Sequence, residues 1–86
     1  MSFWDRKKVL VAGGGGFIGS HVVERLLRGY KGARVTVAWR MSKENKRNLS
    51  EVLRNPYLRM IKGDLRDLRF CRRACKNQDV VLNLAG

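Results

Sequence analysis

The stretch "VLVAGGGGFIGSHVV", residues 9–23, places four consecutive glycines between two apolar runs. Glycine costs roughly 0.5–1 kcal/mol relative to alanine inside regular structure, so four in a row indicate a backbone that must approach something closely. The valine-rich run before them, "KVLVA" at 8–12, predicts a short buried strand. After them, apolar residues recur at helical spacing from Phe17 to about Arg28, which predicts an amphipathic helix. The glycines therefore occupy a strand-to-helix turn.

The same alternation continues through the middle of the chain. In "RVTVAW", residues 34–39, β-branched residues alternate and predict a second strand. A helix is expected from about Lys43 to Arg54, with Ser42 as its N-cap and Asn55-Pro56 as its end. The residues of this helix expected to face inward are Leu49, Val52 and Leu53.

The last third of the chain completes the pattern. "YLRMIKG" at 57–63 predicts a third strand, and "DVVLNLAG" at 79–86 predicts a fourth. Asp64 or Asp67 would cap a helix between them that reaches about Lys76. Its buried side is expected to carry Leu68, Cys71 and Cys75.

The element order is thus β-α-β-α-β-α-β, and strands joined by helical crossovers form a parallel sheet. This order predicts an α/β fold that is one half of a doubly wound parallel sheet, Rossmann-like.

In this context the glycine turn has a chemical role. The first N–H groups of a helix are unpaired and its dipole is positive there, so a pyrophosphate is stabilised if the backbone can come close. Gly14, Gly16 and Gly19 satisfy G-x-G-x-x-G, and Gly13, Gly16 and Gly19 satisfy G-x-x-G-x-x-G. Inside a βαβ unit either register indicates dinucleotide binding, against the alternative of a purely structural turn.

The sequence also resembles a known family. "VLVAGGGGFIGSHVVERLL" is similar to the opening of the extended short-chain dehydrogenase/reductases, the NAD-dependent epimerase/dehydratase group that acts largely on nucleotide sugars. The resemblance continues through "IKGDLRD" at 61–67 to "DVVLNLAG" at 79–86, so it covers almost the whole chain. It implies the G-x-x-G-x-x-G register, with a turn and a helix start formed by Gly13, Gly16, Phe17, Ile18 and Gly19.

Two further motifs of the resemblance imply cofactor contacts. Asp64 matches the family's acidic residue that accepts from the adenine amino group, with Leu65 beside the ring, although Asp64 could instead cap a helix. The fourth strand's end would line the cofactor near the ribose and nicotinamide, the alternative being a buried strand end; its residues are Leu84, Ala85 and Gly86.

The end of the second strand bears on cofactor choice. An acid about 20 residues past the last glycine bonds the ribose 2′-OH of NAD, whereas an arginine there accommodates the 2′-phosphate of NADP. This chain has Trp39 and Arg40 at that place, and the next acidic residue after them is Glu44. The sequence therefore favours NADP, with Arg40 on the phosphate. An Arg40 that points into water, with NAD as the cofactor, is the alternative.

The resemblance to this family implies a catalytic pair that consists of a tyrosine and a lysine four residues after it. Tyr30 and Tyr57 are followed at that spacing by Arg34 and Ile61, so no catalytic residue is expected within the chain. Residues 1–86 are expected to be the N-terminal NAD(P)-binding portion of a longer nucleotide-sugar epimerase, dehydratase or reductase, inactive alone. A non-catalytic NADP-binding sensor and, less favoured, a basic nucleic-acid-binding domain are the alternatives.

Charge and cysteine content limit the remaining classes. Nineteen Lys and Arg against seven Asp and Glu give a net charge of +12, but the basic residues form no compact run. They predict a solvated basic surface rather than a nucleic-acid site.

Cys71 and Cys75 lack further metal ligands near them in the sequence, since the one histidine is His21, so no metal site is expected. A cytoplasmic chain without a membrane segment is expected, with an exposed fourth-strand edge that could pair two copies.

Overall fold

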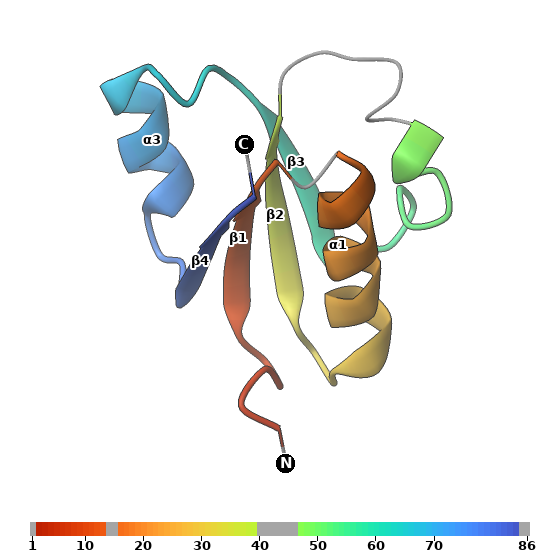
Figure 1. The fold of residues 1–86 in the computed structure, drawn as a ribbon. Helices are drawn as coiled ribbons and strands as arrows, with labels where there is room; N and C mark the ends of the chain where they lie inside the picture. Colours follow the sequence, from red (N-terminus) through yellow and green to blue (C-terminus); the bar gives the residue numbers. More distant parts are fainter. Residues whose placement is uncertain (1, 14–15, 40–46, 85–86) are drawn as a thin grey trace.

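The structure, a computed structural model, describes residues 2–13, 16–39 and 47–84. Four strands form one parallel sheet in the order β3-β2-β1-β4, and α1 and α3 lie on its opposite faces (Figure 1). This arrangement confirms the α/β, Rossmann-like half of a doubly wound sheet. The elements are β1 (Lys8–Ala12), α1 (Phe17–Gly29), β2 (Arg34–Trp39), β3 (Leu58–Lys62), α3 (Leu68–Cys75) and β4 (Val80–Asn83).

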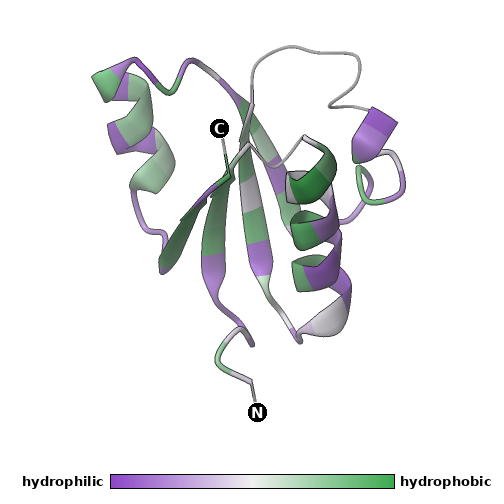
Figure 2. Cartoon of the chain, viewed as in Figure 1, coloured by the Kyte–Doolittle hydropathy of each residue, from purple (hydrophilic) through white to green (hydrophobic). Residues whose placement is uncertain are grey.

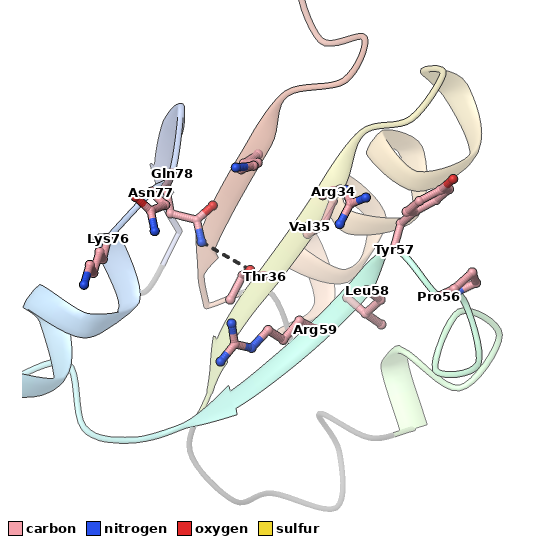
Figure 3. Close-up of a pocket in the computed structure, with 11 residues that line it drawn as sticks. Arg34, Val35, Thr36, Pro56, Tyr57, Leu58, Arg59, Lys76, Asn77 and Gln78 are labelled. Atoms are coloured by element: carbon pink, nitrogen blue, oxygen red, sulfur yellow. Dashed lines mark hydrogen bonds between the residues drawn. The ribbon is translucent and has the colours of Figure 1, made fainter.

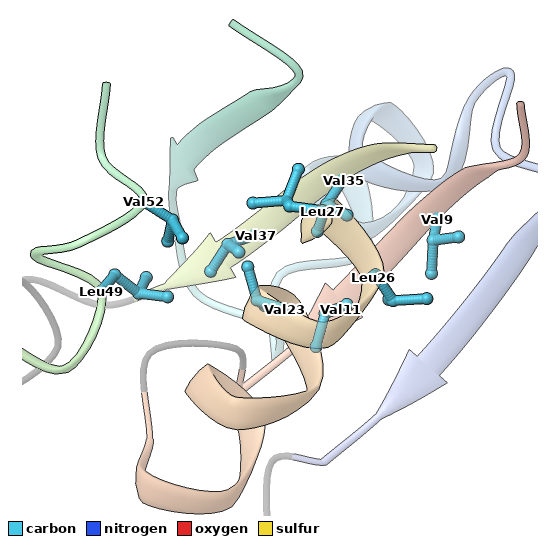
Figure 4. Close-up of a cluster of buried hydrophobic side chains, with 9 residues drawn as sticks. All are labelled: Val9, Val11, Val23, Leu26, Leu27, Val35, Val37, Leu49 and Val52. Atoms are coloured by element: carbon cyan, nitrogen blue, oxygen red, sulfur yellow. The ribbon is translucent and has the colours of Figure 1, made fainter. Parts of the chain in front are cut away.

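The larger core lies between the sheet and α1 (Figure 4). Alternate residues of a strand face opposite sides, so Val9 and Val11 of β1 join Val35 and Val37 of β2 on this side. From α1 the same core receives the side chains that the helical spacing predicted, namely Val23, Leu26 and Leu27.

The segment 47–54 covers part of this core without forming the regular helix that the sequence predicts. Residues 47–48 are helical and 49–54 are turns, while 40–46, which include Ser42, lie outside the described residues. Leu49 and Val52 are buried as predicted, but Leu53 is 41% exposed, so its predicted inward position is wrong. The amide of Val52 donates to the carbonyl of Leu49. This spacing of three turns residues 49 and 52 toward the core and residue 53 away from it.

The smaller core lies under α3, and here the predicted buried side of the helix is wrong. Phe70 and Ala74 are buried against the sheet with Leu10 and Ala38. By contrast, the predicted residues Leu68 and Cys75 are exposed and Cys71 is only half-buried.

The cap of α3 explains this difference. Asp67 accepts hydrogen bonds from the backbone N–H groups of Arg69, at 2.9 Å, and Phe70, at 3.4 Å. It thereby fixes where the helix begins, and Phe70 and Ala74, four residues apart, fall on the sheet side. The thiol of Cys71 instead donates to the carbonyl of Leu65 at 2.9 Å.

Hydropathy follows the same division (Figure 2). The middle of the sheet is apolar, whereas polar residues such as Lys8 and Arg34 occupy the amino ends of β1 and β2. Within residues 2–13, 16–39 and 47–84, no helix is long and apolar enough to cross a membrane.

Gly63, which follows β3, is in close contact with α3. A Cβ atom built on Gly63 would lie 2.2 Å from two ring carbons of Phe70, far inside van der Waals contact. Phe70 is only 5% exposed, so its ring has little room to move away. Glycine is therefore required at this position for packing.

We expect Gly63→Ala to lower the free energy of unfolding by about 1–3 kcal/mol, because the added methyl group overpacks the core under α3. Urea denaturation followed by circular dichroism measures the change. Gly29→Ala is the matched control, since its Cβ would meet only the Arg25 side chain, at 3.4 Å and beyond. Equal stability of the two variants would contradict the packing constraint.

Candidate functional site

The carboxyl ends of the four parallel strands meet at one edge of the sheet. There the amide of Leu84 donates to the carbonyl of Ala12 at 2.8 Å, and the amide of Gly63 donates to the carbonyl of Trp39 at 3.0 Å. These bonds hold the segments after β4 and β3 against their neighbours β1 and β2. In open α/β sheets, ligands bind at this edge.

The glycine turn leaves β1 at the same edge. Gly13 has a φ of 80°, in the left-handed region that glycine adopts without strain. The amide of Gly16 donates to the carbonyl of Gly13 at 3.1 Å and closes the turn. The first helical bond follows at once, from the amide of Ser20 to the carbonyl of Gly16 at 2.8 Å. The predicted strand-to-helix turn is confirmed, with residues 14–15 outside the described part of the chain.

Among the described residues, no side chain caps the first N–H groups of α1. Gly16 is the N-cap residue and makes no side-chain capping bond, and the first turn contains no acidic residue. The Ser20 hydroxyl does not cap it either, since it donates to the carbonyl of Phe17 at 2.9 Å. The side chains of Phe17 and Ile18 are 73% and 70% exposed. Within the described part of the chain, this helix end thus presents N–H donors without a side-chain cap and a positive dipole, which suit a phosphate group.

Asp64 stands two residues beyond β3 and is paired with Arg66. Its carboxylate accepts from the Arg66 backbone N–H at 2.9 Å, from Nε at 3.1 Å and from Nη2 at 2.9 Å. This hydrogen bond raises the pKa of the Arg66 guanidinium above its usual value. The bonds from Arg66 engage both carboxylate oxygens, since Nε also donates to Oδ2 at 3.1 Å.

The alternative role of Asp64 as a helix cap is excluded, because Asp67 caps α3. Leu65 is half-buried against the core under α3. Sequence reasoning missed Arg66; the signal that could have found it is the Asp-x-Arg spacing, since an aspartate commonly accepts from the backbone two residues later.

The structure thus brings most of the predicted residues to one edge of the sheet. Arg40, Ala85 and Gly86 lie outside the described residues. The predicted positions that the structure describes at this edge are Gly13, Gly16, Phe17, Ile18, Gly19, Asp64, Leu65 and Leu84. In the described ranges, no group of three or more His, Cys, Asp and Glu side chains is placed to hold a metal ion.

Comparison with known proteins identifies the class. The model of the NAD dependent epimerase/dehydratase family matches residues 9–86, and the chain belongs to this family. A low-salt glycan biosynthesis protein of Haloferax volcanii is 36% identical over 78 residues, which are 91% of this chain and 25% of that protein.

Solved structures agree with this assignment. A dTDP-glucose 4,6-dehydratase from Bacillus anthracis, in complex with NAD, has a TM-score of 0.82 and 26% identity over 93% of this chain and 27% of that one. A short-chain dehydrogenase/reductase from Veillonella parvula, in complex with NADP, shares the fold at a TM-score of 0.74 and 22% identity, over 90% of this chain and 34% of that one. The chain spans a quarter or less of the length of the curated relatives that it matches first.

We expect Gly13→Ala to lower the free energy of unfolding by about 1–2 kcal/mol, because an L side chain is strained at a φ of 80°. Gly16→Ser is the control: φ at Gly16 is −73°, and serine is a favoured N-cap residue. Thermal unfolding of both variants checks the difference. If Gly13→Ala unfolds with the same midpoint as Gly16→Ser, the turn does not depend on the left-handed conformation.

Proposed function

We propose that this chain is the NAD(P)-binding portion of a longer nucleotide-sugar epimerase, dehydratase or reductase. The observation that carries the proposal is the uncapped start of α1, which the Gly13–Gly16 turn places at the carboxyl edge of the sheet. The donor set there fits an anionic group, since it offers N–H groups without an acidic residue in the first turn. When bound, NAD(P) supplies hydride uptake and return at a carbon of the sugar.

The chain's own residues would bind and orient the cofactor. The backbone N–H groups of Phe17, Ile18 and Gly19 would donate to the pyrophosphate, where the helix dipole adds about 0.3–1 kcal/mol of stabilisation. Asp64, already held by Arg66, would accept from the adenine amino group, with Leu65 beside the ring.

At the end of β4, Leu84 and the residues after it would border the ribose and nicotinamide. Leu84 is 40% exposed and anchored through its amide to the carbonyl of Ala12. This anchor brings it to the strand end that precedes the glycine turn. Ala85 and Gly86 continue the same segment. No tyrosine in the chain is followed four residues later by lysine, so we expect binding without turnover.

We further propose NADP as the preferred cofactor, with Arg40 on its 2′-phosphate. The support is the sequence at the end of β2, where Trp39 and Arg40 stand in place of the acid that favours NAD. A family member and a protein of the same fold are described with NAD and NADP, respectively. The proposed preference for NADP therefore rests on the positive charge of Arg40 and the lack of an acid at the end of β2.

Calorimetric titration with NADPH and with NADH tests the cofactor assignment. We expect Arg40→Ala to weaken NADPH binding roughly tenfold or more and to leave NADH binding nearly unchanged, because only NADPH loses a charge-assisted hydrogen bond. Arg25→Ala, on the exposed side of α1, is the matched control. Equal affinity for the two cofactors, unaffected by Arg40→Ala, would overturn the NADP preference.

Gly16→Ser tests the glycine turn itself. The serine oxygen would accept from the first N–H groups of α1 and stabilise the helix, while removing donors from the pyrophosphate. We expect this variant to bind both cofactors more weakly although its unfolding midpoint is unchanged or higher. Unchanged binding would mean that the start of α1 does not contact the cofactor.

A further inference from the structure

The structure gathers basic residues that are dispersed along the sequence into one groove. The groove has a volume of about 350 Å³ and lies against the amino ends of β2 and β3 and the turn after α3 (Figure 3). It is at the opposite end of the strands from the glycine turn. Its basic lining residues are Lys8, Arg34, Arg59 and Lys76.

Strand register explains how these residues meet. Lys8 pairs with Arg34, and Arg59 pairs with Thr36. Their neighbours Val9, Val35 and Leu58 pack into the core under α1. Because side chains alternate along a strand, Lys8, Arg34 and Arg59 project from the other face of the sheet.

A second cavity, of about 300 Å³, continues the groove along the sheet from the amino ends of the strands toward the carboxyl end of β3, where Ile61 and Lys62 line it. The two cavities share Thr36, Arg59, Lys76 and Gln78, and the second adds Lys62 and Arg73. None of the described residues that line the two cavities is acidic. The groove is therefore elongated and basic, which suits a ligand with more than one anionic group.

Three basic side chains of the groove, Arg34, Arg59 and Lys76, form no ion pair with a described acidic residue. Among the described residues, the ion pairs involve Glu24, Glu51 and Asp64, and none of them includes Arg34, Arg59 or Lys76. Asp79 lies beside the groove, where its carboxylate accepts from the backbone N–H of Lys8 at 2.9 Å. Like charges on paired strands oppose folding unless a counter-charge joins them.

Two neutral side chains in the groove, Gln78 and Tyr57, indicate a ligand that carries more than phosphate groups. Nε2 of Gln78 donates to Oγ1 of Thr36 at 3.2 Å (Figure 3), while Oε1 of Gln78 is buried and has no donor in the described part of the chain. A buried acceptor without a partner is costly, and a ligand N–H or O–H would satisfy it. Tyr57 is 44% exposed, with the Arg34 guanidinium 5.5 Å from its ring centroid, and it offers an aromatic surface to a base.

We propose that this groove binds a nucleotide ligand with several phosphates, at a site separate from the dinucleotide site. Phosphates would lie along Arg34, Arg59 and Lys76, a base would stack on Tyr57, and a donor on the ligand would reach Gln78. A short single-stranded nucleic acid and a free nucleoside triphosphate share this chemistry. The proposal goes beyond NAD(P) binding and does not depend on it.

Fluorescence anisotropy with labelled hexauridylate, titrated at several salt concentrations, tests the groove. We expect Arg59→Gln combined with Lys76→Gln to weaken binding about tenfold or more. The log–log salt slope should become shallower by about 1.4, since each phosphate contact to a single strand contributes about 0.7. The control, Arg25→Gln combined with Lys31→Gln, removes the same charge from exposed positions on and after α1 and should change binding little.

Competition experiments distinguish a nucleic-acid strand from a free nucleotide as the ligand, and the groove from the dinucleotide site. Displacement of the oligonucleotide by ATP at equimolar phosphate assigns the groove to free nucleotides, and failure of ATP to displace it assigns the groove to a strand. Equal weakening by the two double variants would overturn the proposal, because binding would then follow net charge alone. Displacement by NADH, or absence of binding by both oligonucleotide and ATP, would overturn it as well. The Arg59→Gln/Lys76→Gln variant should bind NADH with the same affinity as the unmodified chain. A failure of the groove proposal can therefore be told apart from a failure of the proposed NAD(P) binding.

Discussion

The parallel pairing of β1 with both β2 and β4 is the interaction on which the rest of the structure depends. β1 has a neighbouring strand on each side and contributes side chains to the core on each face, and its Val9 and Val11 have no exposed surface. Because both neighbours run parallel to it, their carboxyl ends emerge beside the glycine turn that β1 leads into. A register shift of one residue would exchange the two faces and expose this core.

The two faces of the sheet are covered unequally. Under α1, the core extends over β1 and β2 and continues beneath residues 47–54. Under α3, a helix of eight residues buries chiefly Phe70 and Ala74, over the carboxyl halves of the strands. Among the described residues, no second apolar element covers the amino halves on this face, and the first cavity of the basic groove lies there.

Sequence reasoning reached the strands, α1 and the glycine turn because each has a strong local pattern. Valine-rich runs and helical spacing need no distant partner to be recognised. The buried side of α3 was misjudged because two cysteines four residues apart suggested one face, whereas Asp67 fixes the helix start and Phe70 occupies the core. The basic groove could not be predicted from the sequence, because Lys8, Arg34 and Arg59 become neighbours only through the register of the paired strands.

The contact between Gly63 and Phe70 links two parts of the molecule that have different tasks. Gly63 directly precedes Asp64, and Phe70 is the largest buried side chain of α3. The sizes of residues 63 and 70 are therefore not independent: a chain with a larger residue at 63 needs a smaller one at 70 to keep the same backbone path. Across related sequences this requirement would appear as covariation between the two positions. A larger side chain at position 63, in the loop that carries Asp64, would accompany a smaller side chain at position 70 in the core under α3.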